Sequence, residues 1–201
     1  RRQRQMCIRD SSLGNHGVWG HGMAAWPSSI HRPSFNIPLI FSGPGVKKGI
    51  SSNLVSQLDL GNTILSLAKA EKLNGEKIDS YSLNLSDENS KKREMVFMEQ
   101  EESRAVRTDR WLYIERFNKE GMDYLKSELY DLEKDQDERI NLSNEKDFLE
   151  YKKMLSEQLS LYFNKFSIPK FDLWKGGSAK SNVSNPSFWK KAWGPNWNIT
   201  F

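Results

Sequence analysis

The sequence contains very little cysteine: Cys7 is the single one among 201 residues. This scarcity excludes an intramolecular disulfide framework and any zinc site built from several thiolates. Long apolar runs are also missing, and without a stretch of about 18 apolar residues we expect no membrane-spanning helix. No apolar segment follows the basic N-terminus, so the pattern of a signal peptide is not visible. None of these absences fixes the cellular compartment.

A large excess of one charge is missing as well. Thirty Lys and Arg residues stand against 26 Asp and Glu residues, which gives a net charge of +4, and the two signs are interspersed. A nucleic-acid-binding domain normally concentrates its basic residues beside stacking aromatic residues, so we expect no nucleic-acid partner. The mild positive bias favours small anionic substrates. A hydrophobic content of 37% is typical of a globular domain with a packed core.

Several common catalytic motifs do not occur. We find no G-x-S-x-G nucleophile elbow and no phosphate-binding or dinucleotide-binding glycine motif. The stretch LGNHGVWGHG at 13–22 places His16 and His21 five residues apart. Zinc sites need three or four protein ligands, and this loop offers two, so we predict no metal ligands in the chain. Glycines on both sides of His21 leave room around its ring, which is as consistent with a ligand contact as with packing.

The N-terminal part has few regular elements. Residues 1–12 show no apolar periodicity, and we interpret them as a non-native or disordered leader. Residues 13–34 are rich in Gly, Pro and Ser and are predicted to form a loop. The apolar run at 36–42 precedes a Gly-Pro-Gly turn and is predicted to be a buried strand. Residues 56–70 carry apolar side chains at helical spacing and predict a helix.

The C-terminal part is more regular. Four short strands are predicted at 95–98, 105–108, 111–117 and 128–132, with connections tight enough for an antiparallel sheet. The residues from 145 to 166 carry a single apolar stripe with steps of three and four, which predicts a long helix lying on that sheet. Four tryptophans lie near the end of the chain, and we expect them to pack rather than to stack on sugars: Trp174, Trp189, Trp193 and Trp197.

Five motifs follow one another in an order and at a spacing that resembles the sulfatase family of the alkaline-phosphatase-like superfamily. The last resembles the family signature E-L-Y-D-L-x-x-D-P-x-E-x-x-N-L. The motifs are LGNHGVWGH at 13–21, IPLI with GPG at 37–45, LV with LDL at 54–60, RAVRTDRWLYI at 104–114, and ELYDL with DQDERINL at 128–142.

The resemblance implies an α/β fold, the C-terminal part of an alkaline-phosphatase-like sulfatase, ending in a small four-stranded antiparallel sheet packed by a long helix. Residues 13–92 would then be the remainder of the catalytic α/β domain. Residues 93–201 would form a C-terminal α+β subdomain with a Trp-rich tail. It also implies a periplasmic or secreted location, while the oligomeric state stays open.

Sulfatases hydrolyse sulfate esters with a formylglycine nucleophile and a calcium ion. The formylglycine motif does not occur in this chain, and the calcium ligands that precede the glycine-rich loop would fall at Ile8 and Arg9, which cannot serve. The resemblance therefore implies a C-terminal fragment whose nucleophile and metal ligands lie upstream. We expect this fragment to be inactive by itself.

The resemblance also implies residue roles in the loop. His21 occupies the position where most sulfatases have a lysine that contacts a sulfate oxygen, so it is the candidate catalytic residue, as a cation or general acid. The loop from His21 to Ile37 is longer than usual. We assign candidate substrate contacts to Trp19, Trp26, His31 and Arg32, with solvated loop residues as the alternative for the last two. For Arg104 and Arg107 we favour salt bridges over substrate contact.

The function predicted from the sequence is thus part of a sulfatase acting on a sulfated small molecule or glycan, either a carbohydrate or an aryl sulfate. One alternative is a phosphodiesterase or phosphonate monoester hydrolase of the same superfamily. Another is a non-catalytic glycan-binding module that uses the Trp-rich tail as a sugar platform.

Overall fold

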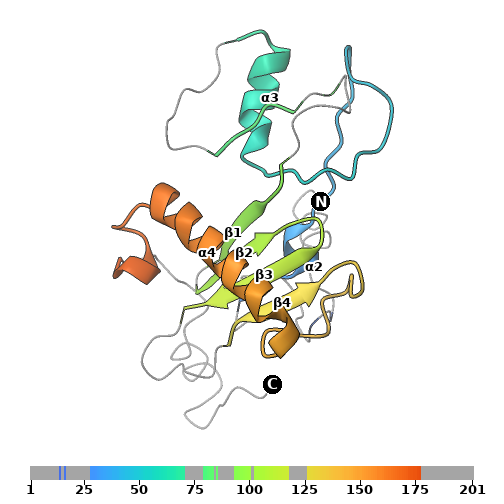
Figure 1. The fold of residues 1–201 in the computed structure, drawn as a ribbon. Helices are drawn as coiled ribbons and strands as arrows, with labels where there is room; N and C mark the ends of the chain where they lie inside the picture. Colours follow the sequence, from blue (N-terminus) through green and yellow to red (C-terminus); the bar gives the residue numbers. More distant parts are fainter. Residues whose placement is uncertain are drawn as a thin grey trace.

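The computed structural model describes residues 14, 16, 28–70, 79–83, 85, 93–100, 102–117 and 126–177. A four-stranded sheet forms the centre, with helices placed before and after it in the chain (Figure 1). The elements are α2 (Arg32–Phe35), α3 (Asp59–Leu67), β1 (Val96–Gln100), β2 (Ser103–Arg107), β3 (Trp111–Arg116), β4 (Glu128–Asp131), the 3-10 helix η3 (Lys146–Phe148), α4 (Leu149–Phe166) and the 3-10 helix η4 (Leu173–Lys175).

The strands follow one another in the order β1-β2-β3-β4, and every neighbouring pair is antiparallel. This confirms the four predicted strands and the predicted sheet. The turn between β2 and β3 is closed from both sides. The Thr108 amide donates to the Trp111 carbonyl (2.8 Å), and the Trp111 amide donates to the Thr108 hydroxyl (2.8 Å). Such short local closures favour a meander over a topology with crossovers.

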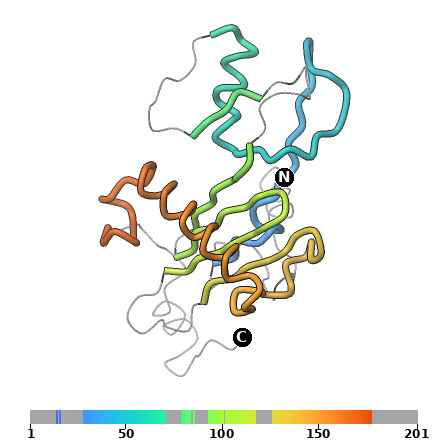
Figure 2. Tube along the Cα trace, in the orientation of Figure 1, coloured from blue at the N-terminus to red at the C-terminus, as the bar shows by residue number. Residues whose placement is uncertain are grey.

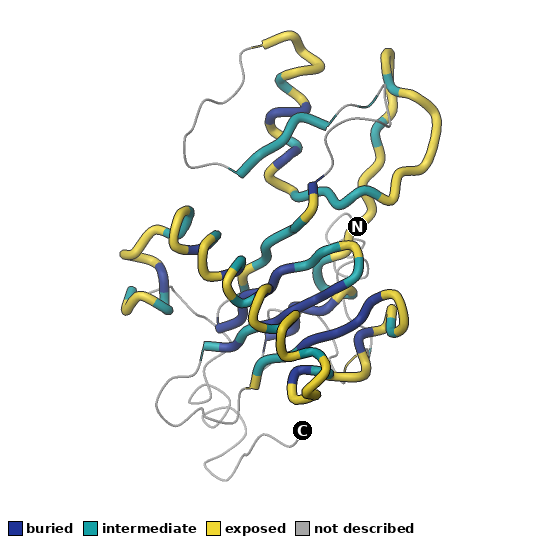
Figure 3. Tube along the Cα trace, viewed as in Figure 1, coloured by how far each residue is buried: buried dark blue, intermediate teal, exposed yellow. Residues whose placement is uncertain are grey.

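Side chains are buried on both faces of the sheet. Because neighbouring residues of a strand point to opposite faces, the register separates them into two rows. One row faces α4, and the other faces the segment 28–35. In Figure 3 the strands are the most continuously buried part of the chain. The first row contains Phe97, Val106, Tyr113 and Leu129, and the second contains Ala105, Leu112, Ile114 and Tyr130.

Helix α4 crosses the first face, as Figure 1 shows. Leu155, Leu159 and Phe163 are its buried residues, spaced four apart along one side. Tyr162 stacks on Phe97 of β1 with ring centroids 3.9 Å apart. The predicted helix is therefore confirmed. Phe163 completes its buried stripe, and the 3-10 helix η3 precedes α4 at Lys146–Phe148.

The opposite face is covered by a segment from the other end of the chain. Ile30 is 1% exposed and inserts between the side chains of β2, β3 and β4. Phe35, at the end of α2, packs against the same cluster. Burial of an isoleucine contributes about 1.5–3 kcal/mol. The sheet is thus the middle of three layers, and the segment 28–35 is one of its two outer layers.

The apolar run 36–42 was predicted to be a buried strand, and this was wrong. The run is extended but pairs with no described strand, and its apolar side chains face outward: Ile40 is 86% exposed. A strand needs a neighbour to satisfy its backbone N–H and C=O groups. The described part of the chain supplies none beside it. The run instead leads away from the sheet toward the exposed turn that contains Gly43 (Figure 2).

Helix α3 confirms the helix predicted at 56–70, with shorter bounds. An ion pair connects it to the sheet, since Arg93, just before β1, donates to both carboxylate oxygens of Asp59 at 2.6 and 3.2 Å. The guanidinium also donates to Asp79 at 2.6 Å. Burial alone would lower the pKa of Arg93, but the two aspartates outweigh it and raise that pKa. None of the described helices is long and apolar enough to cross a bilayer.

A core substitution tests the packing of α4 on the sheet. Leu155 is 0% exposed, so Leu155→Ala should lower the free energy of unfolding by about 2–5 kcal/mol, as expected for a cavity in a packed core. Leu161 lies on the same helix but is 63% exposed, and Leu161→Ala should change it by less than about 0.5 kcal/mol. Urea unfolding followed by circular dichroism measures both. Equal losses would contradict the described orientation of α4.

Candidate functional site

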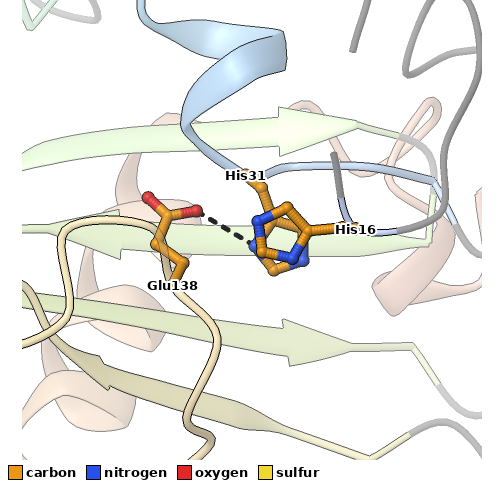
Figure 4. Close-up of side chains that lie close together, drawn as sticks. All are labelled: His16, His31 and Glu138. Atoms are coloured by element: carbon orange, nitrogen blue, oxygen red, sulfur yellow. Dashed lines mark hydrogen bonds and ion pairs between the residues drawn. The ribbon is translucent and has the colours of Figure 1, made fainter. Parts of the chain in front are cut away.

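A buried group of ionisable side chains lies where the segment 28–35 meets the end of the sheet (Figure 4). The His31 ring is at its centre. Its Nδ1 lies 3.1 Å from Oε2 of Glu138, and its Nε2 lies 3.4 Å from Oε2 of Glu128. The Glu138 side chain is 0% exposed. The imidazole therefore bridges two carboxylates that are 10 residues apart in the chain and belong to different parts of the fold.

Local structure holds each carboxylate in place. Glu128 begins β4, and the hydroxyl of Tyr130 donates to its Oε2 at 2.7 Å. Glu138 follows the turn after β4 with φ of 56°, a left-handed conformation that costs a non-glycine residue about 1–2 kcal/mol. Asp135 fixes that turn by accepting from the backbone amides of Arg139 and Ile140 at 2.7 Å each.

The segment carrying His31 is held by backbone contacts as well as by the ring. The amide of Arg32, the first residue of α2, donates to Oε2 of Glu138 at 2.9 Å. Further along the sheet edge, the Ser28 amide donates to Oε1 of Glu102 at 2.6 Å, and the Ser28 hydroxyl donates to the same oxygen at 2.8 Å. Three acidic side chains of the C-terminal part therefore hold residues 28–32 in place. They are Glu102, Glu128 and Glu138.

Arg116 connects these groups. Its guanidinium donates to the Ser28 carbonyl (2.7 Å), to the Ser103 hydroxyl (2.6 Å) and to Glu128 (2.6 Å), and it lies 3.8 Å from Glu102. Burial by itself would raise the pKa of Glu128, but the charges of Arg116 and His31 and the bond from Tyr130 outweigh it, so that pKa is lowered. Glu128 is therefore a carboxylate at neutral pH.

His16 joins the group from the glycine-rich loop. Its ring stacks on His31 with centroids 3.9 Å apart and an interplanar angle of 4°. His16 is exposed on its outer side. Partial desolvation and the neighbouring His31 lower the pKa of His16, against the opposing charges of Glu138 and Glu128. The ring is therefore favoured in its neutral form.

The residues predicted for the site are distributed as follows. His21, Trp19 and Trp26 lie outside the described residues, so their predicted roles stay predictions. His31 is buried at 6% exposure between the two carboxylates, while Arg32 is exposed. The assignment of substrate contact to these last two also stays a prediction, and the contacts described for the His31 ring are to protein groups.

The two arginines of the RAVRTDRWLYI motif behave differently. Arg104 forms the predicted salt bridges, with Glu99 at 2.7 Å and with the buried Asp172 at 2.7 Å. Its guanidinium also lies over the Phe163 ring at 4.1 Å. Arg107 forms no ion pair within the described part of the chain. Burial lowers the pKa of Arg107, which the charge of Glu138 partly offsets.

Sequence reasoning did not single out Glu102, Arg116, Glu128 and Glu138. The last two lie in the signature at 128–142, at its first and second Glu positions. That signature was used only as a mark of resemblance, although an acidic residue at a fixed place in a turn was a signal for a buried partner. Glu102 and Arg116 gave no such signal, because charged residues at strand ends are ordinarily solvated.

The tryptophan-rich tail is described as far as residue 177. Trp174 packs against Phe117 with ring centroids 5.4 Å apart, and its ring lies 5.0 Å from the guanidinium carbon of Arg104. This is the packing role expected for it. Trp189, Trp193 and Trp197 lie outside the described residues.

The residues present do not fit the calcium ion that the resemblance implies. Calcium is held by six to eight oxygen ligands, mostly from carboxylates and carbonyls. The positions expected for its ligands are Ile8 and Arg9, which offer no side-chain oxygen and lie outside the described residues. The cluster around His31 contributes two imidazoles, which are poor calcium ligands.

The family model described as "N-sulphoglucosamine sulphohydrolase, C-terminal" matches residues 26–165. The chain belongs to this family, which confirms the resemblance and the fold class inferred from the sequence. No curated protein matches the sequence.

Solved structures agree with the family. A protein of Bacteroides thetaiotaomicron described as a candidate sulfatase matches with a TM-score of 0.61 and 25% identity, over 77% of this chain and 34% of that one. A 2-O GAG sulfatase matches in fold with a TM-score of 0.63 and 24% identity, over 86% of this chain and 37% of that one. The chain thus spans about a third of the length of each of these two proteins.

Removing the charge of Arg116 tests the importance of the buried network. Arg116→Met would leave Glu128 and Glu102 without their shared cation, and losing one partner of a buried ion pair costs about 3–5 kcal/mol. We expect the free energy of unfolding to fall by that amount in a urea titration. Arg139 is 74% exposed, and Arg139→Met should change it by less than about 0.5 kcal/mol. A small effect of Arg116→Met would show that the network does not hold the segment 28–35.

Proposed function

We propose that this chain is the C-terminal part of a sulfatase that hydrolyses sulfate esters of carbohydrates or aryl groups. The observation that carries the proposal is the family match over residues 26–165, a range that includes the signature at 128–142. The name of that family, which refers to a sulfated glucosamine, favours a sulfated carbohydrate among these substrates. The formylglycine nucleophile and the calcium ligands would come from sequence upstream of the motifs described above.

The outer surface of residues 36–70 supports the proposal that the rest of the catalytic domain is encoded upstream. Seven large apolar side chains of this segment are at least 40% exposed, two of them on α3. A surface of this kind is typical of an interface with another part of a protein. The upstream part of the catalytic α/β domain is the natural cover for it. The seven residues are Ile37, Leu39, Ile40, Ile50, Leu58, Ile64 and Leu67.

Within that enzyme, we assign His21 the role of cation and proton donor at the sulfate ester. Cleavage of the S–O bond leaves negative charge on the leaving oxygen. A protonated imidazole within hydrogen-bond distance stabilises this charge and can supply the proton, as general acids do. Sulfatases usually place a lysine at this position, and the charge of a lysine persists at higher pH than that of a histidine.

The two alternative functions have weaker support. A phosphonate monoester hydrolase of Agrobacterium radiobacter overlaps with a TM-score of 0.43 and 18% identity, over 59% of this chain and 27% of that one, and it carries no argument about activity. For a glycan-binding module, Trp174 is the tail tryptophan that the structure describes, and it is packed against protein rather than presented to solvent.

The chain by itself should show no sulfatase activity. The reason is that it contains no formylglycine motif and no residues suited to calcium at the expected positions. The measurement is hydrolysis of a chromogenic aryl sulfate by the purified chain, compared with the same chain extended by its upstream coding sequence. Turnover by the short chain would contradict the proposed function. An upstream sequence without a C-x-P-S-R-like motif would contradict it independently.

The role of His21 is tested in the extended enzyme. His21→Ala should lower kcat about 10²–10⁴-fold, the usual contribution of a positioned general acid. His21→Lys should retain activity and hold it at higher pH, because an ordinary imidazole loses its proton above about pH 6.5 whereas a lysine keeps its proton to about pH 10. A pH–rate profile of the three enzymes measures this. Unchanged kcat in His21→Ala would remove His21 from the mechanism.

A further inference from the structure

Glu138 has no lysine or arginine in ion-pair contact among the described residues, although Arg107 interacts with it electrostatically at longer range. Glu128 is balanced by Arg116 at 2.6 Å. Glu138 is fully buried, and its ionic contact is His31, which carries charge only if protonated. Its second oxygen, Oε1, is buried without a hydrogen-bond partner in the described part of the chain. Glu138 thus has a buried oxygen, Oε1, that is open to a further ligand, and burying an unpaired polar atom is costly.

The His31 ring lies between two carboxylates. Its Nδ1 is hydrogen-bonded to Oε2 of Glu138 at 3.1 Å, and its Nε2 lies 3.4 Å from Oε2 of Glu128. A metal on Nδ1 in place of this hydrogen bond would leave the Nε2–H facing Glu128. Metal-binding histidines commonly donate their other N–H to a carboxylate outside the metal's coordination shell in this way.

His16 supplies a third donor on the open side. One ligand atom each from His16, His31 and Glu138 lies within 4.8 Å of the others (Figure 4). The ligand atoms of a tetrahedral zinc site lie about 3.3 Å apart, given bonds of about 2.0–2.1 Å. His31 and Glu138 already have this separation. The His16 ring stacks parallel to His31 and would have to turn out of the stack to direct a nitrogen at the same metal.

We propose that His16, His31 and Glu138 form a binding site for a divalent transition metal, of which zinc is the best-matched ion. Two imidazole nitrogens and one carboxylate oxygen suit zinc, while calcium and magnesium prefer oxygen ligands. The fourth position lies on the exposed side of His16 and takes a water molecule. The metal supplies Glu138 with a cation in direct contact and joins the glycine-rich loop to the C-terminal sheet.

The proposed site takes ligands from outside the glycine-rich loop. The loop alone cannot hold zinc, because it offers two histidines, His16 and His21, and no third ligand. The structure combines His16 with His31 and with Glu138, 107 residues further along from His31. Glu138 comes close to the two histidines because the fold places the turn after β4 beside the segment 28–35.

Zinc binding to the whole 201-residue chain tests the proposal. Isothermal titration with zinc chloride at pH 7.5, in a Cys7→Ser background that removes the single thiol, should give one zinc per chain, and zinc should raise Tm. His16→Ala should weaken binding more than about 100-fold, because even residues outside the coordination shell typically contribute 10–100-fold. Glu138→Gln should do the same. Circular dichroism identifies any variant that fails to fold.

The matched control is His21→Ala, which removes the third histidine of the chain and should leave zinc affinity unchanged. His16 is exposed, so His16→Ala keeps the test valid even if Glu138→Gln unfolds. If wild type binds no zinc at micromolar concentration, the proposal is overturned. It is equally overturned if His21→Ala loses binding while His16→Ala retains it.

Discussion

The guanidinium of Arg116 is the group on which this arrangement depends. It lies at the end of β3 and binds at once to β2, to β4 and to the incoming segment at Ser28. A buried cation of this kind is stable only when its partners are all present. Those partners are the carboxylates that also hold Ser28 and His31. The segment 28–35, which covers the face of the sheet opposite α4, is therefore held by ion pairs and hydrogen bonds at its edges and by the Ile30 side chain at its centre.

This layer explains the composition of the strands. In β3, four consecutive residues, Trp111 to Ile114, are buried, which is unusual for an antiparallel sheet with one wet face. The long helix accounts for half of this burial. The segment 28–35 accounts for the other half, although most of it has no regular structure. A short irregular segment is therefore as much a part of the domain core as α4.

The sequence predicted those features that depend on neighbours in the chain. The strands at 96–116 and helix α4 have local periodicity and short connections, and both were found. The segment at 36–42 has the same apolar character but needs a strand partner that the described residues do not contain, and its prediction as a buried strand failed. The local sequence pattern indicates which residues tend to form a strand, whereas strand pairing depends on whether a partner strand lies beside them.

The candidate site was even harder to predict from the local sequence pattern. His16 and His31 were visible as histidines in a loop, but the carboxylates that define their environment come from β4 and the turn after it. Glu138 adopts a left-handed backbone and a buried side chain, two features that the residue type disfavours. Neither could be inferred from spacing. The family signature marked the position of Glu138 without indicating its partner.

The contact between His31 and Glu138 also has a consequence for how the chain folds. The β2–β3 hairpin closes over a turn of a few residues, whereas the His31 contact closes a loop of 107 residues. The entropic cost of closure grows with the logarithm of loop length, and distant contacts slow folding. We expect the sheet and α4 to assemble first and the segment 28–35 to dock onto a preformed surface. The N-terminal layer is thus the last to be acquired and the first to be released when the protein opens.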